Sequence, residues 1–120
     1  MNEKFSSDKF LSKVHRGDAY NCLHFARDVW LELTGEDLGG RMKALHATAS
    51  ARRALPSDLK SFEKLAAPVT PCLALMRRGR TPPHIGVFLR RRILHLNERG
   101  AIFQLPSMAA MTFDSISYYR

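Results

Sequence analysis

The stretch Tyr20-Asn21-Cys22-Leu23-His24-Phe25-Ala26-Arg27-Asp28-Val29-Trp30 predicts an amphipathic helix with a cysteine at its N-terminal end. Its apolar residues recur at the spacing of one helical face, namely Cys22, Phe25, Ala26, Val29 and Leu33. Asn21 is a favourable N-cap, and Thr34-Gly35 is a typical stop signal. We therefore expect this helix to dock through one face and to carry Cys22 against the rest of the domain.

Cys22 has two interpretations. A thiol in the first turn of a helix lies near the positive end of the helix dipole and beside unpaired backbone N–H groups. Both favour the thiolate, which is the nucleophilic form of cysteine. Alternatively, Cys22 is a small buried apolar residue, which is the common role of a lone cysteine. The choice depends on whether the chain supplies a base.

Composition indicates one domain over residues 1–120. The chain has 120 residues, 45% of them hydrophobic and 25% charged, so it can form a core without disulfides. Cys22 and Cys72 lack a CxxC spacing, so we expect free thiols, no metal and no cofactor, with Cys72 in the core. The N-terminus lacks an apolar signal segment and no run is long enough to span a membrane. Synthesis in the cytoplasm is therefore expected.

The formal net charge of +8 predicts attraction to polyanions such as nucleic acid, anionic lipid or acidic cell-wall polymer. Arginines cluster at residues 52–53, 77–80 and 90–92, where they can equally be solvated residues beside turns. No aromatic residues interleave with these clusters, which disfavours single-strand binding by base stacking. We expect no specific nucleic-acid partner.

The order of elements predicts an α+β domain. Residues 1–20 form a lead-in with one or two helical turns, in which Phe5, Phe10, Leu11 and Val14 pack on the domain. A helix over residues 41–54, with Met42, Leu45 and Ala49 on one face, ends before Pro56, and a shorter helix runs to Leu65. His46 is expected at the surface or in a cap.

From Pro68 onward the pattern changes to short strands. We expect five of them, at residues 72–76, 84–89, 93–96, 101–105 and 116–119. Helices followed by a meander of strands indicate N-terminal helices packed on one face of a five-stranded antiparallel sheet.

Two strands carry histidines that can meet. Alternation places His84, Gly86 and Phe88 on one face of their strand, and His95 can share that face from the next strand. Gly86 leaves room for a helix backbone to approach closely. We expect the Cys22 helix to pack on this face and to bring the thiol to the imidazoles.

These three residues form a candidate catalytic triad. His84 would take the proton of the Cys22 thiol, and His95 would orient the His84 ring. The backbone N–H groups of Cys22 and Leu23 would receive the developing oxyanion. Singly, each histidine is more simply a satisfied polar residue at a strand end.

This arrangement resembles the NlpC/P60 family of papain-like cysteine peptidases. Asn21-Cys22-Leu23-His24-Phe25 is similar to the family's Asp-Cys-Ser-Gly-Phe helix start, and His84-Ile85-Gly86-Val87-Phe88-Leu89 to its His-Val-Gly-Ile-Tyr-Leu strand. Ile93-Leu94-His95 resembles the strand that carries the third catalytic residue. The ending at residues 116–120 is similar to members encoded by phages and prophages. The resemblance implies a papain-like fold and an endopeptidase cutting between D-glutamate and a diamino acid in peptidoglycan stem peptides.

Three departures from the family concern substrate binding. Asn21 replaces the usual aspartate, and Leu23-His24 replaces the small pair after the cysteine, which predicts a narrower cleft there. A substrate-contacting tyrosine that is frequent in the family is represented here by Phe10, with Tyr20 as a substitute. We therefore expect Tyr20 and His24 to contact substrate.

Three functions from different classes remain open. The first is a thiol hydrolase of phage or prophage origin, carried with the virion tail or released by lysis, that acts at the cell wall. The second is a catalytically silent domain of the same fold, used with phage tail proteins as a structural or assembly component. The third, nucleic-acid binding, depends on charge alone.

Overall fold

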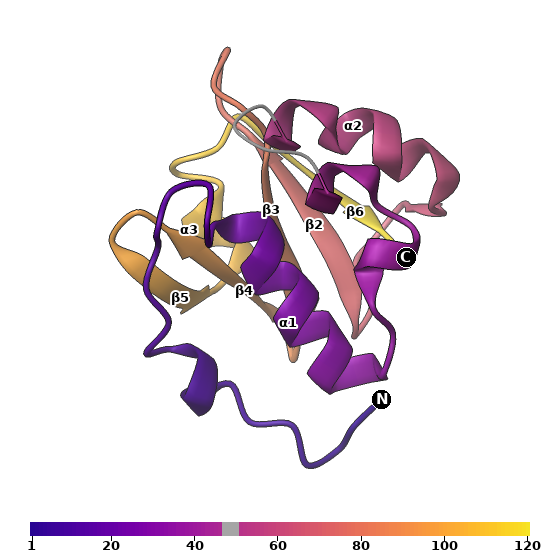
Figure 1. The fold of residues 1–120 in the computed structure, drawn as a ribbon, viewed down its shortest axis with the longest axis vertical. Coiled ribbons are helices and arrows are strands. Elements are labelled where there is room, and N and C mark those ends of the chain that lie inside the picture. Colours follow the sequence, from indigo (N-terminus) through magenta and orange to yellow (C-terminus); the bar gives the residue numbers. More distant parts are fainter. Residues whose placement is uncertain (47–50) are drawn as a thin grey trace.

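The computed structural model describes residues 1–46 and 51–120 and confirms an α+β architecture (Figure 1). Helix α1 (Cys22–Thr34) begins and ends where the sequence predicts, with Asn21 as N-cap and Gly35 as C-cap in the left-handed conformation. Among the described residues, no helix is long and apolar enough to cross a membrane.

The sheet has six antiparallel strands in the order β1-β6-β2-β3-β4-β5. They are β1 (Lys64–Leu65), β2 (Cys72–Arg77), β3 (His84–Leu89), β4 (Arg92–Asn97), β5 (Gly100–Gln104) and β6 (Ser115–Tyr119). The five predicted strands are present within a residue or so of their expected ends. The prediction of five missed β1, because this two-residue edge strand is too short to show a period of two and exists only through its pairing with β6.

The region between α1 and the sheet differs from the prediction. The expected helix over residues 41–54 is replaced by short 3₁₀ helices at Lys43–His46 and Ala51–Ala54, and Ala49 lies outside the described residues. The shorter helix that we expected to run to Leu65 is also wrong: α2 (Leu55–Asp58) has Pro56 in its first turn, where a missing N–H costs nothing, and Leu65 lies in β1 because it pairs with β6. Further 3₁₀ turns occur at Asp8–Phe10, Leu38–Gly40 and Leu59–Ser61.

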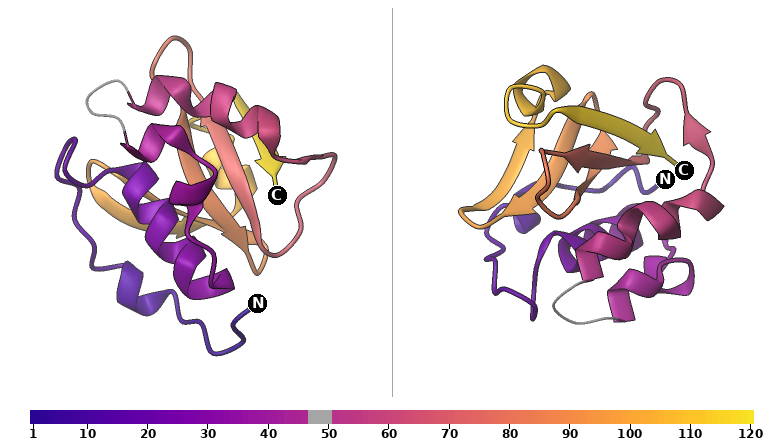
Figure 2. Two further views of the ribbon diagram at one scale, coloured as in Figure 1. Left: turned by 45° about the vertical axis from the view of Figure 1, so that its right-hand side comes forward. Right: turned by 90° about the horizontal axis from the view of Figure 1, so that it is seen from above.

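Helices cover both faces of the sheet, as Figure 2 shows from above. Helix α1 packs on the face formed by Ile85, Val87, Leu94 and Leu96, in one apolar core. The short helix α3 (Pro106–Ala109) contributes to a second, smaller core on the opposite face, which contains Cys72, Ala74, Met76, Phe88, Ile93 and Ala109. The placement of Cys72 in a core is confirmed.

The predicted face for α1 is wrong. We expected α1 on the face that carries His84 and Gly86, but it covers the face of Ile85 and Val87. The physical reason is hydrophobic burial, since a row of branched aliphatic side chains removes more apolar area from water than histidine and glycine do. Cys22 therefore approaches the histidines from the end of the sheet, and not from above their face.

The N-terminal lead-in packs through its aromatic residues. Phe5 stacks on Phe10 with ring centroids 5.6 Å apart, and Phe10 meets Phe25 of α1 edge-on at 6.0 Å. Leu11 and Val14 stay 43% and 62% exposed, so the prediction that they pack on the domain is wrong. Phe10 is thus part of the core.

Candidate active site

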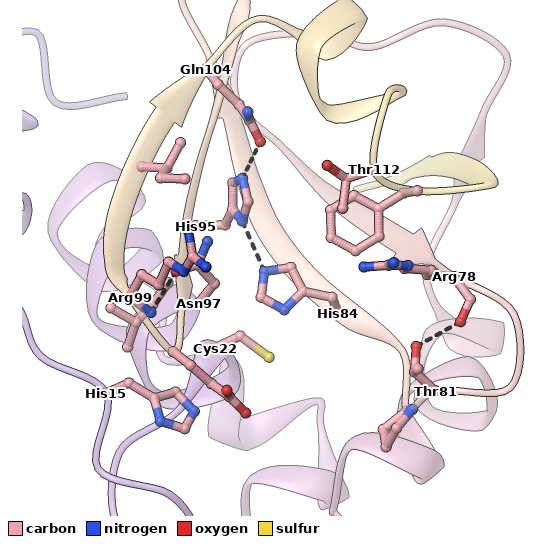
Figure 3. A pocket seen from close by; sticks show the side chains of 15 residues that line it. His15, Cys22, Arg78, Thr81, His84, His95, Asn97, Arg99, Gln104 and Thr112 are labelled. Carbon is pink, nitrogen blue, oxygen red and sulfur yellow. Dashed lines mark hydrogen bonds between the residues drawn. The ribbon is translucent and has the colours of Figure 1, made fainter.

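The three predicted catalytic residues line one pocket of about 380 Å³ at the end of the sheet where β3 begins and β4 ends (Figure 3). His84 is the first residue of β3, His95 lies within β4, and Cys22 opens α1. Figure 3 shows the Cys22 sulfur pointing into the pocket toward the His84 ring. The N-terminus of α1 thus reaches the histidines past the strand ends, although the helix body covers the other face.

A chain of hydrogen bonds runs through the two histidines. His84 Nε2 lies 2.8 Å from His95 Nδ1, and His95 Nε2 lies 2.7 Å from Gln104 Oε1. An amide oxygen can only accept, so His95 Nε2 carries a hydrogen and its Nδ1 accepts from His84 Nε2–H. His84 Nδ1 is then the basic nitrogen, and in Figure 3 it lies on the side of the ring where Cys22 lies. This tautomer is the one that a cysteine–histidine pair requires.

Gln104, which closes this chain of hydrogen bonds, was not predicted as a site residue. It lies on β5, where Ile102 pairs with His95 and Gln104 itself pairs with Ile93. Since side chains two positions apart share a strand face, Gln104 stands on the same face as His95. The available signal was a polar residue closing an apolar strand, but only the register of β5 on β4 brings it to the ring.

Phe113, which packs against the second core, contacts the rings of both His84 and His95. Its ring stacks on His84 with centroids 5.5 Å apart and an interplanar angle of 12°, and meets His95 edge-on at 6.3 Å. An aromatic face over His84 stabilises a positive charge on that imidazole and limits water on that side. Phe113 lies in the segment between α3 and β6, which no sequence motif connected to the histidines.

Burial governs the protonation of the second histidine. His95 is 2% exposed, and this burial lowers its pKa, while the hydrogen bond to Gln104 opposes the shift. The ring is therefore neutral at neutral pH, as its role between two hydrogen-bond partners requires. Burial also raises the pKa of the Cys72 thiol, which lies outside the pocket.

Gly86 is tight against the neighbouring strand. A Cβ atom placed there would lie 2.9 Å from His95 Cβ and 3.0 Å from the Leu94 carbonyl oxygen. The prediction that Gly86 admits a helix backbone is therefore wrong, because the close neighbour is β4. The absence of a side chain at Gly86 lets His95 lie across β3 and reach His84.

The residues around the cysteine serve the helix cap. The Leu23 backbone N–H donates to Asn21 Oδ1 at 3.0 Å, and the Asn21 N–H donates to His24 Nδ1 at 3.1 Å, which together form a capping box. Leu23 is 1% exposed and belongs to the core. The Leu23 N–H already donates to the cap, so it is not available to the predicted oxyanion. The Leu23 side chain is buried and therefore does not narrow the cleft.

The two predicted substrate contacts lie elsewhere. The Tyr20 hydroxyl donates to Asp28 at 2.8 Å, and its ring stacks on His24 with centroids 6.0 Å apart. Burial and this hydrogen bond raise the pKa of Tyr20, while burial lowers the pKa of His24. Neither residue lines the pocket that contains Cys22. Both instead stabilise the start of α1.

The pocket is also lined by charged side chains that were not predicted as site residues. Arg78 and Arg99 stand on opposite sides of it in Figure 3, and Glu98 and His15 complete its charged and titratable lining. Arg78 belongs to the β2–β3 hairpin and Arg99 to the β4–β5 turn. Two guanidinium groups in the same pocket as the thiol favour a substrate that carries carboxylates.

Fold and site together define an α+β domain with a cysteine–histidine–histidine pocket. No protein-family model matches the chain, and neither does any curated protein. Within the part of the chain that the structure describes, no group of three or more His, Cys, Asp or Glu side chains is arranged to hold a metal ion.

Proposed function

We propose that the chain is a cysteine peptidase of the NlpC/P60 type. The observation that carries the proposal is the hydrogen-bonded chain from Gln104 through His95 to His84, which ends in the pocket that Cys22 lines. Such a chain supplies a base of defined tautomer beside a thiol at a helix N-terminus, which are the elements of nucleophilic catalysis.

The reaction follows from these positions. The Cys22 thiol gives its proton to His84, and the thiolate attacks the carbonyl carbon of a peptide bond. The positive end of α1 stabilises the oxyanion that forms. The His84 imidazolium then protonates the leaving amine, and an acyl-thioester remains on Cys22. Water, deprotonated by His84, hydrolyses the thioester and restores the thiol.

The substrate we propose is the stem peptide of peptidoglycan, cut between D-glutamate and a diamino acid. The resemblance of Asn21-Cys22 and of the His84 strand to the family supports this choice. Arg78 and Arg99 are suited to the free carboxylates of such peptides. A phage or prophage origin, association with tail proteins and action at the cell wall belong to the same proposal.

Digestion of purified murein tests the proposed function. Incubation with the protein is expected to release peptides with new amino ends on the diamino acid, and mass spectrometry of the fragments identifies the bond. Murein that has been amidated at its free carboxylates is the matched control, and it should be cut more slowly because Arg78 and Arg99 lose their anionic partners. Murein with no new amino ends after prolonged incubation would rule the proposal out.

A second candidate is a catalytically silent assembly component of the same fold. One observation favours it: the Leu23 N–H, which would have helped to bind an oxyanion, is already engaged by Asn21. A silent domain has no need of a reactive thiol, whereas a peptidase does.

Alkylation by iodoacetamide at neutral pH separates the two candidates. In a peptidase, Cys22 is expected to react rapidly, whereas Cys72 serves as an internal control because burial raises its pKa and keeps it unreactive. Peptide mapping by mass spectrometry locates the modified residue. Equal and slow labelling of both cysteines in the folded protein would favour the silent component.

A further inference from the structure

A second hollow, which we call the arginine hollow, lies next to the catalytic pocket. It measures about 250 Å³ and is lined by Arg53, Arg77, Gly79, Arg80 and Thr81, together with two prolines. Arg53 comes from the 3₁₀ helix Ala51–Ala54, and the other four come from the end of β2 and the β2–β3 hairpin, which projects beyond the sheet in Figure 1.

The arginine hollow is strongly cationic. Among the described residues, its lining includes three exposed guanidinium groups and no carboxylate. The ion pairs formed between described residues lie elsewhere, at Lys9–Glu32, Arg27–Asp37 and Arg41–Glu36. Asp114 accepts a hydrogen bond from the Gly79 N–H at 2.6 Å but does not line the hollow. Three like charges gathered in one concave surface raise the local potential for an anion.

We propose that the arginine hollow binds phosphate groups of a linear phosphodiester polymer that carries no nucleobases. A guanidinium group offers two parallel N–H donors that match the oxygens of a phosphate, and Arg53, Arg77 and Arg80 supply three such groups. None of the described residues that line the hollow is aromatic, so they offer no platform on which a base could stack. A polymer of alternating polyol and phosphate units matches these features.

The position of the arginine hollow connects it to the catalytic pocket. Thr81 lines both the arginine hollow and the catalytic pocket. Arg78, on the same hairpin, lines the catalytic pocket but not the arginine hollow. A polymer chain held by Arg53 and Arg80 would therefore keep material attached to it beside Cys22. The binding itself needs no step at Cys22, so it can be present or absent whether or not the proposed peptidase activity is.

Direct binding to a synthetic glycerol phosphate oligomer tests the inference. The full chain carrying Cys22→Ala is titrated with the oligomer by calorimetry at about 0.15 M salt, where long-range attraction is screened. Arg53→Gln combined with Arg80→Gln is expected to weaken binding by roughly tenfold or more, because two charge-assisted contacts are lost. The variant should stay folded because both side chains are exposed, and circular dichroism checks this.

A charge-matched control removes two positive charges at the other end of β3. Lys4→Gln combined with Arg91→Gln does this, since Arg91 lies in the β3–β4 turn and Lys4 precedes Phe5, whose carbonyl oxygen accepts from Arg90. This control is expected to change binding less than about twofold. Equal weakening in both double variants, or no binding to the parent chain, would overturn the inference.

A single-stranded oligonucleotide with the same number of phosphates provides the second comparison. It is expected to bind no more tightly than the glycerol phosphate oligomer, because the hollow has no stacking surface for bases. Tighter binding of the oligonucleotide, lost in Arg53→Gln with Arg80→Gln, would overturn the assignment to a polymer without bases and point to nucleic acid.

Discussion

Replacing Cys22 with alanine is expected to lower the rate of peptide release from murein by about a thousandfold or more, because the attacking sulfur is removed. The change is small in volume, and Cys22 is one of many residues in the apolar core, so the fold should persist. The loss should therefore appear in the rate at saturating substrate, and not in thermal stability. Fragment release is followed by mass spectrometry and stability by thermal unfolding.

Cys72→Ala is the matched control for this prediction. Cys72 is fully buried in the second core and does not line the pocket, so its replacement should cost some stability and leave the rate nearly unchanged. His84→Ala should match Cys22→Ala in effect, and the double variant Cys22→Ala with His84→Ala should be no worse than either alone, since the pair acts as a unit. Additive losses would show that the two residues do not act in one reaction.

Replacing Gly86 with alanine is expected to damage both the fold and the site. The added Cβ would lie 2.7 Å from Ile93 Cγ2, 2.9 Å from His95 Cβ and 3.0 Å from the Leu94 carbonyl oxygen. Because one of these atoms is backbone, β3 and β4 must separate, at a cost of about 1–3 kcal/mol. His95 would move with β4, and a shift of about 1 Å in a catalytic group can lower the rate by roughly a hundredfold.

Gly40→Ala is the control for the glycine. A Cβ at Gly40 meets no atom within 4 Å, and its backbone is not in the left-handed region, so alanine should be tolerated or slightly stabilising. Urea unfolding measures stability, and the chemical shifts of the His84 and His95 ring protons report on the hydrogen-bonded chain. A Gly86→Ala variant with unchanged stability and unchanged ring shifts would contradict the tight packing of β3 on β4.

Local patterns in the sequence were sufficient to predict the helix that carries Cys22 and the shared face of the two histidines. Asn21, the apolar stripe after Cys22 and Gly35 define helix α1 through contacts within a few residues, so the helix and its first residue could be predicted. The alternation in β3 and β4 likewise indicated that His84 and His95 share a face, which their 2.8 Å hydrogen bond confirms. Both inferences use periods that belong to the chain itself.

Local patterns gave wrong predictions for residues whose role depends on a contact in the folded structure. Leu23 and His24 were interpreted as cleft residues because they depart from a family motif, but one is buried in the core and the other closes the capping box. A sequence shows that a residue differs from a motif, whereas its hydrogen-bond partner depends on the folded geometry of the helix start. The partner of Tyr20 was hidden from the sequence for the same reason, since its hydroxyl donates to Asp28.

By itself, the sequence determined an α+β chain, a capped helix that begins at Cys22, and two histidines on a common strand face. Only the tertiary structure decided that α1 covers the opposite face, that Gln104 orients His95, and that Phe113 stacks on His84. The physical reason is that periodicity states which side chains share a face, but burial of apolar area decides which face is covered. Strand register then decides which distant residue, such as Gln104, completes the chain of hydrogen bonds.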